Sequence, residues 1–242
     1  MHLKFNEIQI EEEVQDIEGR LPAILLQETT QVLVPKTGRN SIAKNRLTHS
    51  YEVSTSSKIM AAHIAKSFGL SLKDIDYNHC LKQISLLHDI GHAPFGHDGQ
   101  KIINNKFQEL GLEEGFSDNN NNLVIIEDHG IKLRDCVKAG VIKYPEKLYK
   151  DQKSKYIKIL NNAIEEDRMH FKKLGINLKK QKTTIACQIM DEADRNSYTC
   201  SDLADFFCLG NSISLQEMRD LARNKRLDLE CSEFATLANM IK

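Results

Sequence analysis

The sequence predicts an all-α protein. Only four prolines and twelve glycines interrupt its 242 residues. Long segments place apolar residues three and four positions apart, the spacing of one face of an α-helix. Hydrophobic residues make up 40% of the chain, which supplies a sizeable core. We therefore expect a single domain over residues 1–242, with a core over about 27–210 and a helical tail over 211–242.

The first strong helical pattern runs from Thr48 to Phe68, and Gly69 is a natural stop after it. Its apolar face consists of Val53, Met60, Ala61, Ile64, Ala65 and Phe68. The acidic run Glu11–Glu18 before it is expected to be plain surface. A second helix is expected to begin at a cap, Asp74 or Asp76, and to end at Gly91.

Later segments continue the helical pattern. A helix is expected from Gly96 to about Leu110, followed by one that begins in the asparagine run 119–122. The apolar residues 123–126 would also suit a short strand, but the helical context favours a helix. Two long helices are expected over 156–171 and 183–209.

Composition and charge narrow the function classes. The net charge is −1 and aromatic residues make up 6%, so nucleic-acid binding is not favoured. The start of the chain lacks the apolar segment of a secretory signal, and no stretch reaches the roughly 18 apolar residues that span a membrane. The six cysteines form no CxxC pair and are expected to be reduced thiols. We expect a cytoplasmic protein.

Two lysine-rich stretches, Lys143–Lys158 and Lys172–Lys182, carry most of the clustered positive charge. They fit either a solvated surface or a positive rim for a polyphosphate. We favour the solvated surface, because charge runs on helices usually face water.

The most informative segment is LLHDIGHAPFGH, residues 86–97. His88 and Asp89 close an apolar helix and present one nitrogen and one oxygen together, a mixed set that first-row divalent metals accept. His92 and His97 follow across a tight turn. Two ligands rarely hold a catalytic metal, so further ligands are expected elsewhere.

Candidates lie on both sides of this segment. Upstream, Arg46 and His49 are one helical turn apart. Downstream, Asp194, Tyr198 and Asp202 are spaced by four and form one stripe on a helix. Taken singly, each has a plainer interpretation, a hydrogen-bonded core histidine or a solvated acidic face. Their occurrence together predicts a metal site.

These segments resemble one known family. NRLTHSYEV, LLHDIGHAPFGH, FSDNNNNL, VIKYP and ADRNSYTCSD are similar to motifs of the HD-domain deoxynucleoside triphosphate triphosphohydrolases, whose best-known members are bacterial dGTPases. The resemblance implies an all-helical HD-domain bundle. It also implies a divalent metal, Mn²⁺, Mg²⁺ or Fe²⁺, a deoxynucleoside triphosphate (dNTP) as substrate, and a homo-oligomer. The implied products are a deoxynucleoside and inorganic triphosphate.

The resemblance also implies roles for individual residues. The implied metal ligands are His49, His88, Asp89 and Asp194. The implied catalytic residues are His97, His92 and Arg46. The implied substrate contacts are Gln31, Arg46, Asn119, Lys143, Tyr198, Asp202 and Arg195, with Tyr198 excluding a 2′-hydroxyl and Asp202 and Gln31 reading the 3′-hydroxyl.

One position departs from the family pattern. Gln100 stands where the bacterial enzymes usually carry a glutamate that assists the histidine, and glutamine holds neither a proton nor a negative charge. Asp98 or Asp118 are the candidate replacements. Gln100 keeps open the alternative of a nucleotide-binding relative without turnover. The short chain is compatible with a second alternative, an HD-type 5′-nucleotidase for deoxynucleoside monophosphates. The base preference is not readable from the sequence.

Overall fold

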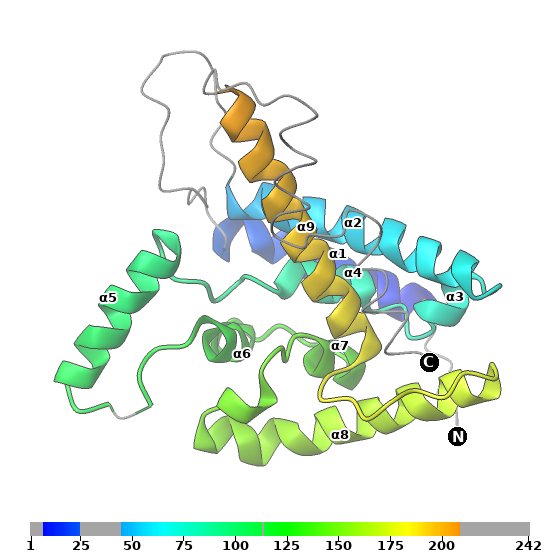
Figure 1. The fold of residues 1–242 in the computed structure, drawn as a ribbon. Coiled ribbons are helices and arrows are strands. Elements are labelled where there is room, and N and C mark those ends of the chain that lie inside the picture. Colours follow the sequence, from blue (N-terminus) through cyan, green and yellow to red (C-terminus); the bar gives the residue numbers. More distant parts are fainter. Residues whose placement is uncertain (1–6, 25–44, 113, 209–242) are drawn as a thin grey trace.

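A computed structural model describes residues 7–24, 45–112 and 114–208, without the side chains of residues 22–24, 97 and 199–208. Within these ranges the chain forms nine α-helices, one short 3₁₀ helix and no strand, which confirms the all-α prediction (Figure 1). The elements are α1 (Glu7–Ile24), α2 (Arg46–Ser67), α3 (Leu72–Ile75), α4 (Leu81–Leu87), α5 (Gly96–Glu109), α6 (Asp118–Asp128), α7 (Asp135–Gly140), η1 (Pro145–Lys147), α8 (Lys150–Lys173) and α9 (Ile185–Cys208).

Helix α1 corrects the expectation that the acidic run Glu11–Glu18 is plain surface. Its apolar residues Val14, Ile17 and Leu21 are buried against the core. Glu13 is buried too, and its carboxylate accepts hydrogen bonds from the backbone nitrogen and Nε of Arg134 at 2.7 and 2.6 Å. This ion pair attaches α1 to the segment that precedes α7.

Helix α2 begins at a side-chain cap, since Oδ1 of Asn45 accepts a hydrogen bond from the backbone nitrogen of Thr48 at 2.8 Å. Its buried face combines the predicted apolar residues with small serines. Ser57 meets Ser85 of α4, with 3.0 Å between the two hydroxyl oxygens. The small side chains allow the two helices to approach closely.

The predicted helix from Asp74 or Asp76 to Gly91 is divided and shorter in the structure. Ser71 and Asp74 form a capping box at the start of the short α3. Oδ1 of Asp76 accepts the backbone N–H groups of Cys80 and Leu81, so it does cap the start of α4. Helix α4 ends at Leu87, and residues 88–91 form a turn instead of a last helical turn.

The long helices α8 and α9 confirm the two predicted near the end of the core. Asp167 of α8 joins them, since its Oδ2 accepts a hydrogen bond from the backbone nitrogen of Ile185, the first residue of α9, at 2.7 Å. Tyr77 donates to Oδ1 of the same carboxylate at 3.0 Å. This contact fixes the start of α9 against the body of the protein.

Helix α2 packs along both α4 and α9, and α7 packs on α8 (Figure 1). The buried apolar residues of these helices form one core cluster. Helix α5 lies apart from the other helices in the same view. No helix in the described ranges is long and apolar enough to cross a membrane. Cys80, Cys136 and Cys187 are free thiols, as expected.

Candidate metal centre and cleft

Three predicted metal ligands lie together inside the protein. His49 comes from α2, His88 follows the last residue of α4, and Asp194 comes from α9. One ligand atom from each lies within 4.8 Å of the others, and all three residues are buried. An ion that binds nitrogen and oxygen at about 2.1 Å separates its ligand atoms by about 3–4 Å. The three side chains therefore form a cluster of suitable size for a divalent metal.

The chemistry of His88 fits a metal ligand. Its Nδ1 donates a hydrogen bond to the carbonyl oxygen of Ser85 at 2.7 Å, which leaves the lone pair on Nε2. Nε2 is buried and has no hydrogen-bond partner among the described residues, and Oδ1 of Asp194 lies 3.4 Å away. A buried nitrogen of this kind is costly unless something binds it. The residues present thus fit a metal ion.

Electrostatics inside the cluster favour charged carboxylates. Burial alone would raise the pKa of Asp194, but the hydrogen bond from His49, the neighbouring imidazole of His88 and the positive charge of Lys143 hold it well below its usual range. Burial alone would lower the pKa of His88, but the carboxylates of Asp89 and Asp194 raise it. The site therefore has negative charge available for a cation.

Asp89, the fourth predicted ligand, lies beside the cluster. Its Oδ1 is 3.8 Å from Nε2 of His88, while its Oδ2 is 3.6 Å from Nη1 of Arg46 and 3.4 Å from the hydroxyl of Tyr198. Burial would raise the pKa of Asp89, but attraction to His88 and His92 lowers it. Its role as a metal ligand stays a prediction.

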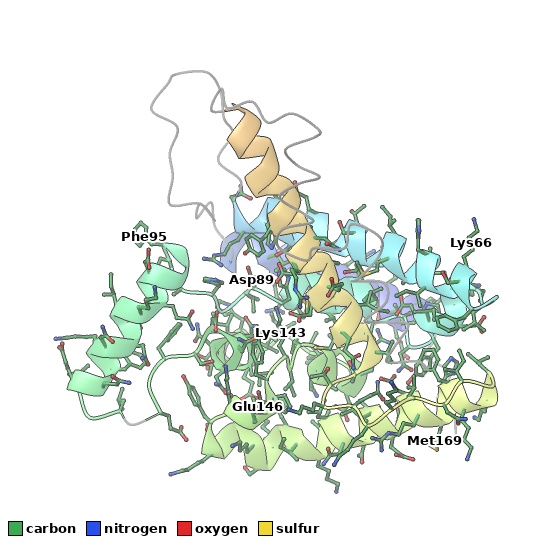
Figure 2. The ribbon with its side chains drawn as sticks, viewed as in Figure 1. Lys66, Asp89, Phe95, Lys143, Glu146 and Met169 are labelled. Atoms are coloured by element: carbon green, nitrogen blue, oxygen red, sulfur yellow. The ribbon has the colours of Figure 1, made fainter. Side chains whose placement is uncertain are left out.

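A cleft of about 570 Å³ opens over the cluster, large enough for a small-molecule ligand. Its walls come from the turn that follows α4, from α5, α6 and α9, and from the segments around Phe116 and Lys143. In Figure 2, Asp89 and Lys143 lie near each other in the centre of the protein, beside α9, whereas Phe95 lies at the upper end of α5, where that helix begins. The metal cluster is thus part of an accessible cleft.

Cationic side chains line this cleft. Nζ of Lys143 is 2.6 Å from Asp191 and 3.3 Å from Asp194, and these carboxylates raise the pKa of Lys143 despite burial, so it stays protonated. Arg195 is 60% exposed at its side chain and pairs with Glu192 at 3.1 Å. Lys147 lies over the ring of Tyr144, 4.8 Å from its centre. Lys143 and Lys147 of the first lysine-rich stretch therefore line the cleft, so this part of the stretch differs from the solvated surface that we favoured.

Asp118 is a cleft carboxylate that the predicted site did not include. Its Oδ1 accepts a hydrogen bond from Nε2 of Gln100 at 3.2 Å, and its Oδ2 lies 4.0 Å from Nε2 of His92. The other candidate, Asp98, has a side chain 71% exposed and pairs with Lys101 at 3.1 Å. Of the two candidates, Asp118 is therefore the carboxylate placed to assist a histidine in place of the glutamate that Gln100 replaces. The sequence signal for it was Gln100 in place of the usual glutamate, which made Asp98 and Asp118 the two candidate replacements.

The remaining predicted site residues divide into two groups. Asn119 lines the cleft, and its side chain donates a hydrogen bond to Asp118. Gln31 lies outside the described residues, and so do the side chains of His97 and Asp202, although both belong to described helices, α5 and α9. Their assigned roles stay predictions.

Comparisons with known proteins agree with this site. The family model described as HD domain matches residues 46–199, which include the three clustered ligands. "Deoxyguanosinetriphosphate triphosphohydrolase-like protein 2" of Deinococcus radiodurans is 30% identical, with 81% of this chain and 52% of the relative covered.

Two similar proteins, both named "Deoxyguanosinetriphosphate triphosphohydrolase-like protein", come from Shewanella species. That of Shewanella oneidensis is 27% identical, with 81% of this chain and 53% of the relative covered. That of Shewanella woodyi is 26% identical, with 89% of this chain and 57% of the relative covered. The chain thus spans about half the length of the curated relatives it matches. With a matching family model over more than half of its length and a His-Asp cluster beneath a cleft, the chain belongs to the HD-domain family.

Proposed function

We propose that the protein is a metal-dependent phosphohydrolase that hydrolyses a deoxynucleoside triphosphate, dGTP or a broader range of dNTPs, to the deoxynucleoside and inorganic triphosphate. One observation carries the proposal: two imidazoles and a carboxylate lie together at a cleft that also presents cationic side chains. The printed names of the similar proteins point to the same substrate class.

In the proposed enzyme, His49, His88 and Asp194 hold the metal, with Asp89 as the fourth ligand. Mn²⁺, Mg²⁺ and Fe²⁺ all accept a mixed nitrogen and oxygen ligand set. When bound, a divalent ion supplies a Lewis acid that polarises phosphate oxygens and makes a water more acidic. Arg46 is held by a 2.7 Å hydrogen bond from Nη2 to the carbonyl oxygen of Ala93, and its Nη1 lies 3.6 Å from Oδ2 of Asp89.

The triphosphate binds along the cationic wall. Lys143 stays protonated because Asp191 and Asp194 flank it, and Arg195 and Lys147 add positive charge further out in the cleft. Such charges stabilise phosphate oxygens most strongly where water is excluded. These local positive charges balance the negative charge of the triphosphate, although the net charge of the whole protein is only −1.

The reaction needs one proton to reach the leaving group. Water attacks the α-phosphorus and releases one of its protons, the bond from phosphorus to the 5′-oxygen breaks, and the 5′-oxygen takes up a proton as the deoxynucleoside leaves. His97 or His92 donates this proton, because imidazole titrates near neutral pH. The carboxylate of Asp118, 4.0 Å from Nε2 of His92, stabilises that imidazole when it is protonated.

The sugar binds near the stripe of α9. Tyr198 lines the cleft, and the centre of its ring lies 4.5 Å from the centre of the His49 ring. A bulky ring here leaves no room for a 2′-hydroxyl, and Asp202 and Gln31 read the 3′-hydroxyl. Deoxyribonucleotides are therefore the proposed substrates.

Product analysis tests the proposal. The purified protein is incubated with Mn²⁺ or Mg²⁺ and each of the four dNTPs, singly and mixed, and the products are separated by ion-exchange chromatography. Deoxynucleoside plus triphosphate is the expected result, and the relative rates give the base preference. Orthophosphate released from deoxynucleoside monophosphates alone would replace the proposal with the 5′-nucleotidase alternative. Binding without any product would replace it with the non-catalytic alternative.

A further inference from the structure

Asn122 of α6 connects directly to the turn that carries the His88–Asp89 pair. Its Nδ2 donates a hydrogen bond to the carbonyl oxygen of His88 at 2.6 Å, and its Oδ1 accepts one from the backbone nitrogen of Gly91 at 2.6 Å. The residue is 2% exposed. One side chain therefore holds the main chain on both sides of Asp89.

The backbone packing makes this contact rigid. A Cβ atom on Gly91 would lie 2.2 Å from the backbone nitrogen of Asn122 and 2.8 Å from the carbonyl oxygen of Asp118, so no side chain fits there. Asn121 adds a hydrogen bond from its Nδ2 to the carbonyl oxygen of Gly91 at 2.9 Å. The turn thus lies against the start of α6 with no space between them.

Asn122 also provides a hydrogen-bond donor for a carbonyl group at the end of α4. His88 follows the last residue of α4, where carbonyl groups have no partner within the helix. The amide of Asn122 satisfies the carbonyl of His88, while the carbonyl of Ser85 fixes its imidazole through Nδ1. Main chain and ring of His88 are therefore held independently, the first by α6 and the second by α4.

We propose that Asn122 is a positioning residue of the metal centre. It holds the main chain of the His88–Asp89 pair, and thereby sets the distance of this pair from the other ligands, His49 and Asp194. The inference rests on the proposed metal-dependent function. The hydrogen bonds of Asn122 to His88 and Gly91 act on the metal site through the main chain, so their loss should weaken metal binding. Ligand-orienting residues of this kind typically change metal affinity by about 10- to 100-fold.

Asn120 provides a matched control on the same helix. It is 1% exposed, its Oδ1 accepts the backbone N–H of Tyr149 at 2.9 Å, and its Nδ2 donates to the carbonyl oxygen of Lys147 at 2.9 Å. It is thus the same side chain, equally buried and making the same two kinds of bond, but to the segment around η1. Comparing the two positions separates metal positioning from general loss of stability.

The experiment titrates metal-free full-length protein with Mn²⁺ by calorimetry, for the wild type, Asn122→Asp and Asn120→Asp. In each aspartate variant an oxygen replaces the amide donor and faces a carbonyl oxygen. Thermal unfolding of the metal-free proteins measures the loss of stability. We expect similar losses of stability in both variants, a loss of Mn²⁺ affinity of about 10- to 100-fold in Asn122→Asp, and little change in Asn120→Asp.

A milder variant, Asn122→Ser, carries the same comparison against Asn120→Ser if circular dichroism shows that an aspartate variant does not fold. Unchanged Mn²⁺ affinity at position 122, equal affinity losses at both positions, or a wild type that binds no Mn²⁺ would overturn the inference. Failure of the proposed function looks different: a wild type that binds Mn²⁺ but hydrolyses no dNTP refutes the reaction and leaves the affinity comparison intact.

Discussion

Nε2 of His49 lies 2.9 Å from Oδ1 of Asp194, although 145 positions separate the two residues in the chain. Helix α2 carries the first and α9 the second, and these helices pack along each other. The metal cluster is therefore completed by tertiary packing. Its formation depends on the whole arrangement of α2, α4 and α9.

Replacing Asp194 with asparagine should remove metal binding. The amide keeps one oxygen but loses the negative charge beside His49 and His88. We expect Mn²⁺ affinity, measured by calorimetry on metal-free protein, to fall by more than about 100-fold, beyond the loss caused by a supporting residue. Asp191→Asn is the control, because Asp191 contacts Lys143 at 2.6 Å but is not part of the cluster. Equal affinity in Asp194→Asn and the wild type would exclude Asp194 as a ligand.

Asp118→Asn should lower turnover while the KM for the dNTP changes little, because the amide cannot stabilise a protonated His92. We expect kcat to fall by about 100-fold, a typical contribution of acid–base assistance. The double variant Gln100→Glu/Asp118→Asn places the carboxylate at position 100 instead of 118, two positions whose side chains lie 3.2 Å apart in the wild type. It should recover part of the lost kcat. Asp98→Asn, on the exposed side of α5, should behave as the wild type. Full kcat in Asp118→Asn would remove Asp118 from the reaction.

Tyr198→Ala should relax the discrimination against ribonucleotides. Removing the ring opens space beside His49, where the proposed site leaves no room for a 2′-hydroxyl. We expect the ratio of kcat/KM for dGTP over GTP to fall at least about tenfold, the lower end of what steric selection in a pocket contributes. Tyr198→Phe keeps the ring, so it should keep the ratio and lose only the contact of the hydroxyl with Asp89. An unchanged ratio in the alanine variant would place the sugar elsewhere.

Asp167 should make the protein less stable as the pH rises through the acidic range. Burial raises the pKa of Asp167 to about 6 from an ordinary value of 3.8. The folded protein therefore keeps this proton at pH values where the unfolded chain has released it. Its contribution to the free energy of unfolding is complete below about pH 4 and is lost as the pH rises to about 6, by roughly 3 kcal/mol.

Asp167→Asn removes this titration and can still accept the hydrogen bond from the backbone nitrogen of Ile185. Urea unfolding of both proteins at a series of pH values between the two pKa values measures the effect. The free energy of unfolding of the wild type should decrease relative to that of the variant as the pH rises. Parallel curves for the two proteins would contradict a raised pKa.

Local periodicity was sufficient to predict most helices but not their ends or their long-range partners. The pattern around Tyr156 and Phe171 marks α8 correctly, because both residues are buried on one face. Helix α1 was missed because its many acidic residues resemble a solvated surface. The partner that buries Glu13, Arg134, lies 121 positions away. No local pattern carries that information.

The site shows the same division. The histidines and the aspartate of the cluster were predicted together, since their residue types and order indicate metal binding. Asp118 was predicted only as one of two candidates, with Asp98, because the sequence does not show which carboxylate lies near Gln100. Asn122 was not predicted, because it bonds to main-chain groups, which leave no signature in the sequence. The asparagine run was interpreted only as the polar start of a helix. Two of its residues, Asn120 and Asn122, are buried and hydrogen-bond to main-chain groups of other segments.

Gly91 forms hydrogen bonds with Asn121 and Asn122, which lie at the opposite end of the segment 92–120. These bonds hold the two ends of the segment together. The segment contains α5, which lies apart from the other helices (Figure 1), and contributes His92, Gln100 and Asp118 to the cleft. Insertions or exchanges within it can reshape the wall that faces a substrate while its base stays anchored. Changes at positions of this segment other than His92, His97 and Asp118 would therefore alter one wall of the cleft and leave the cluster of His49, His88 and Asp194 in place.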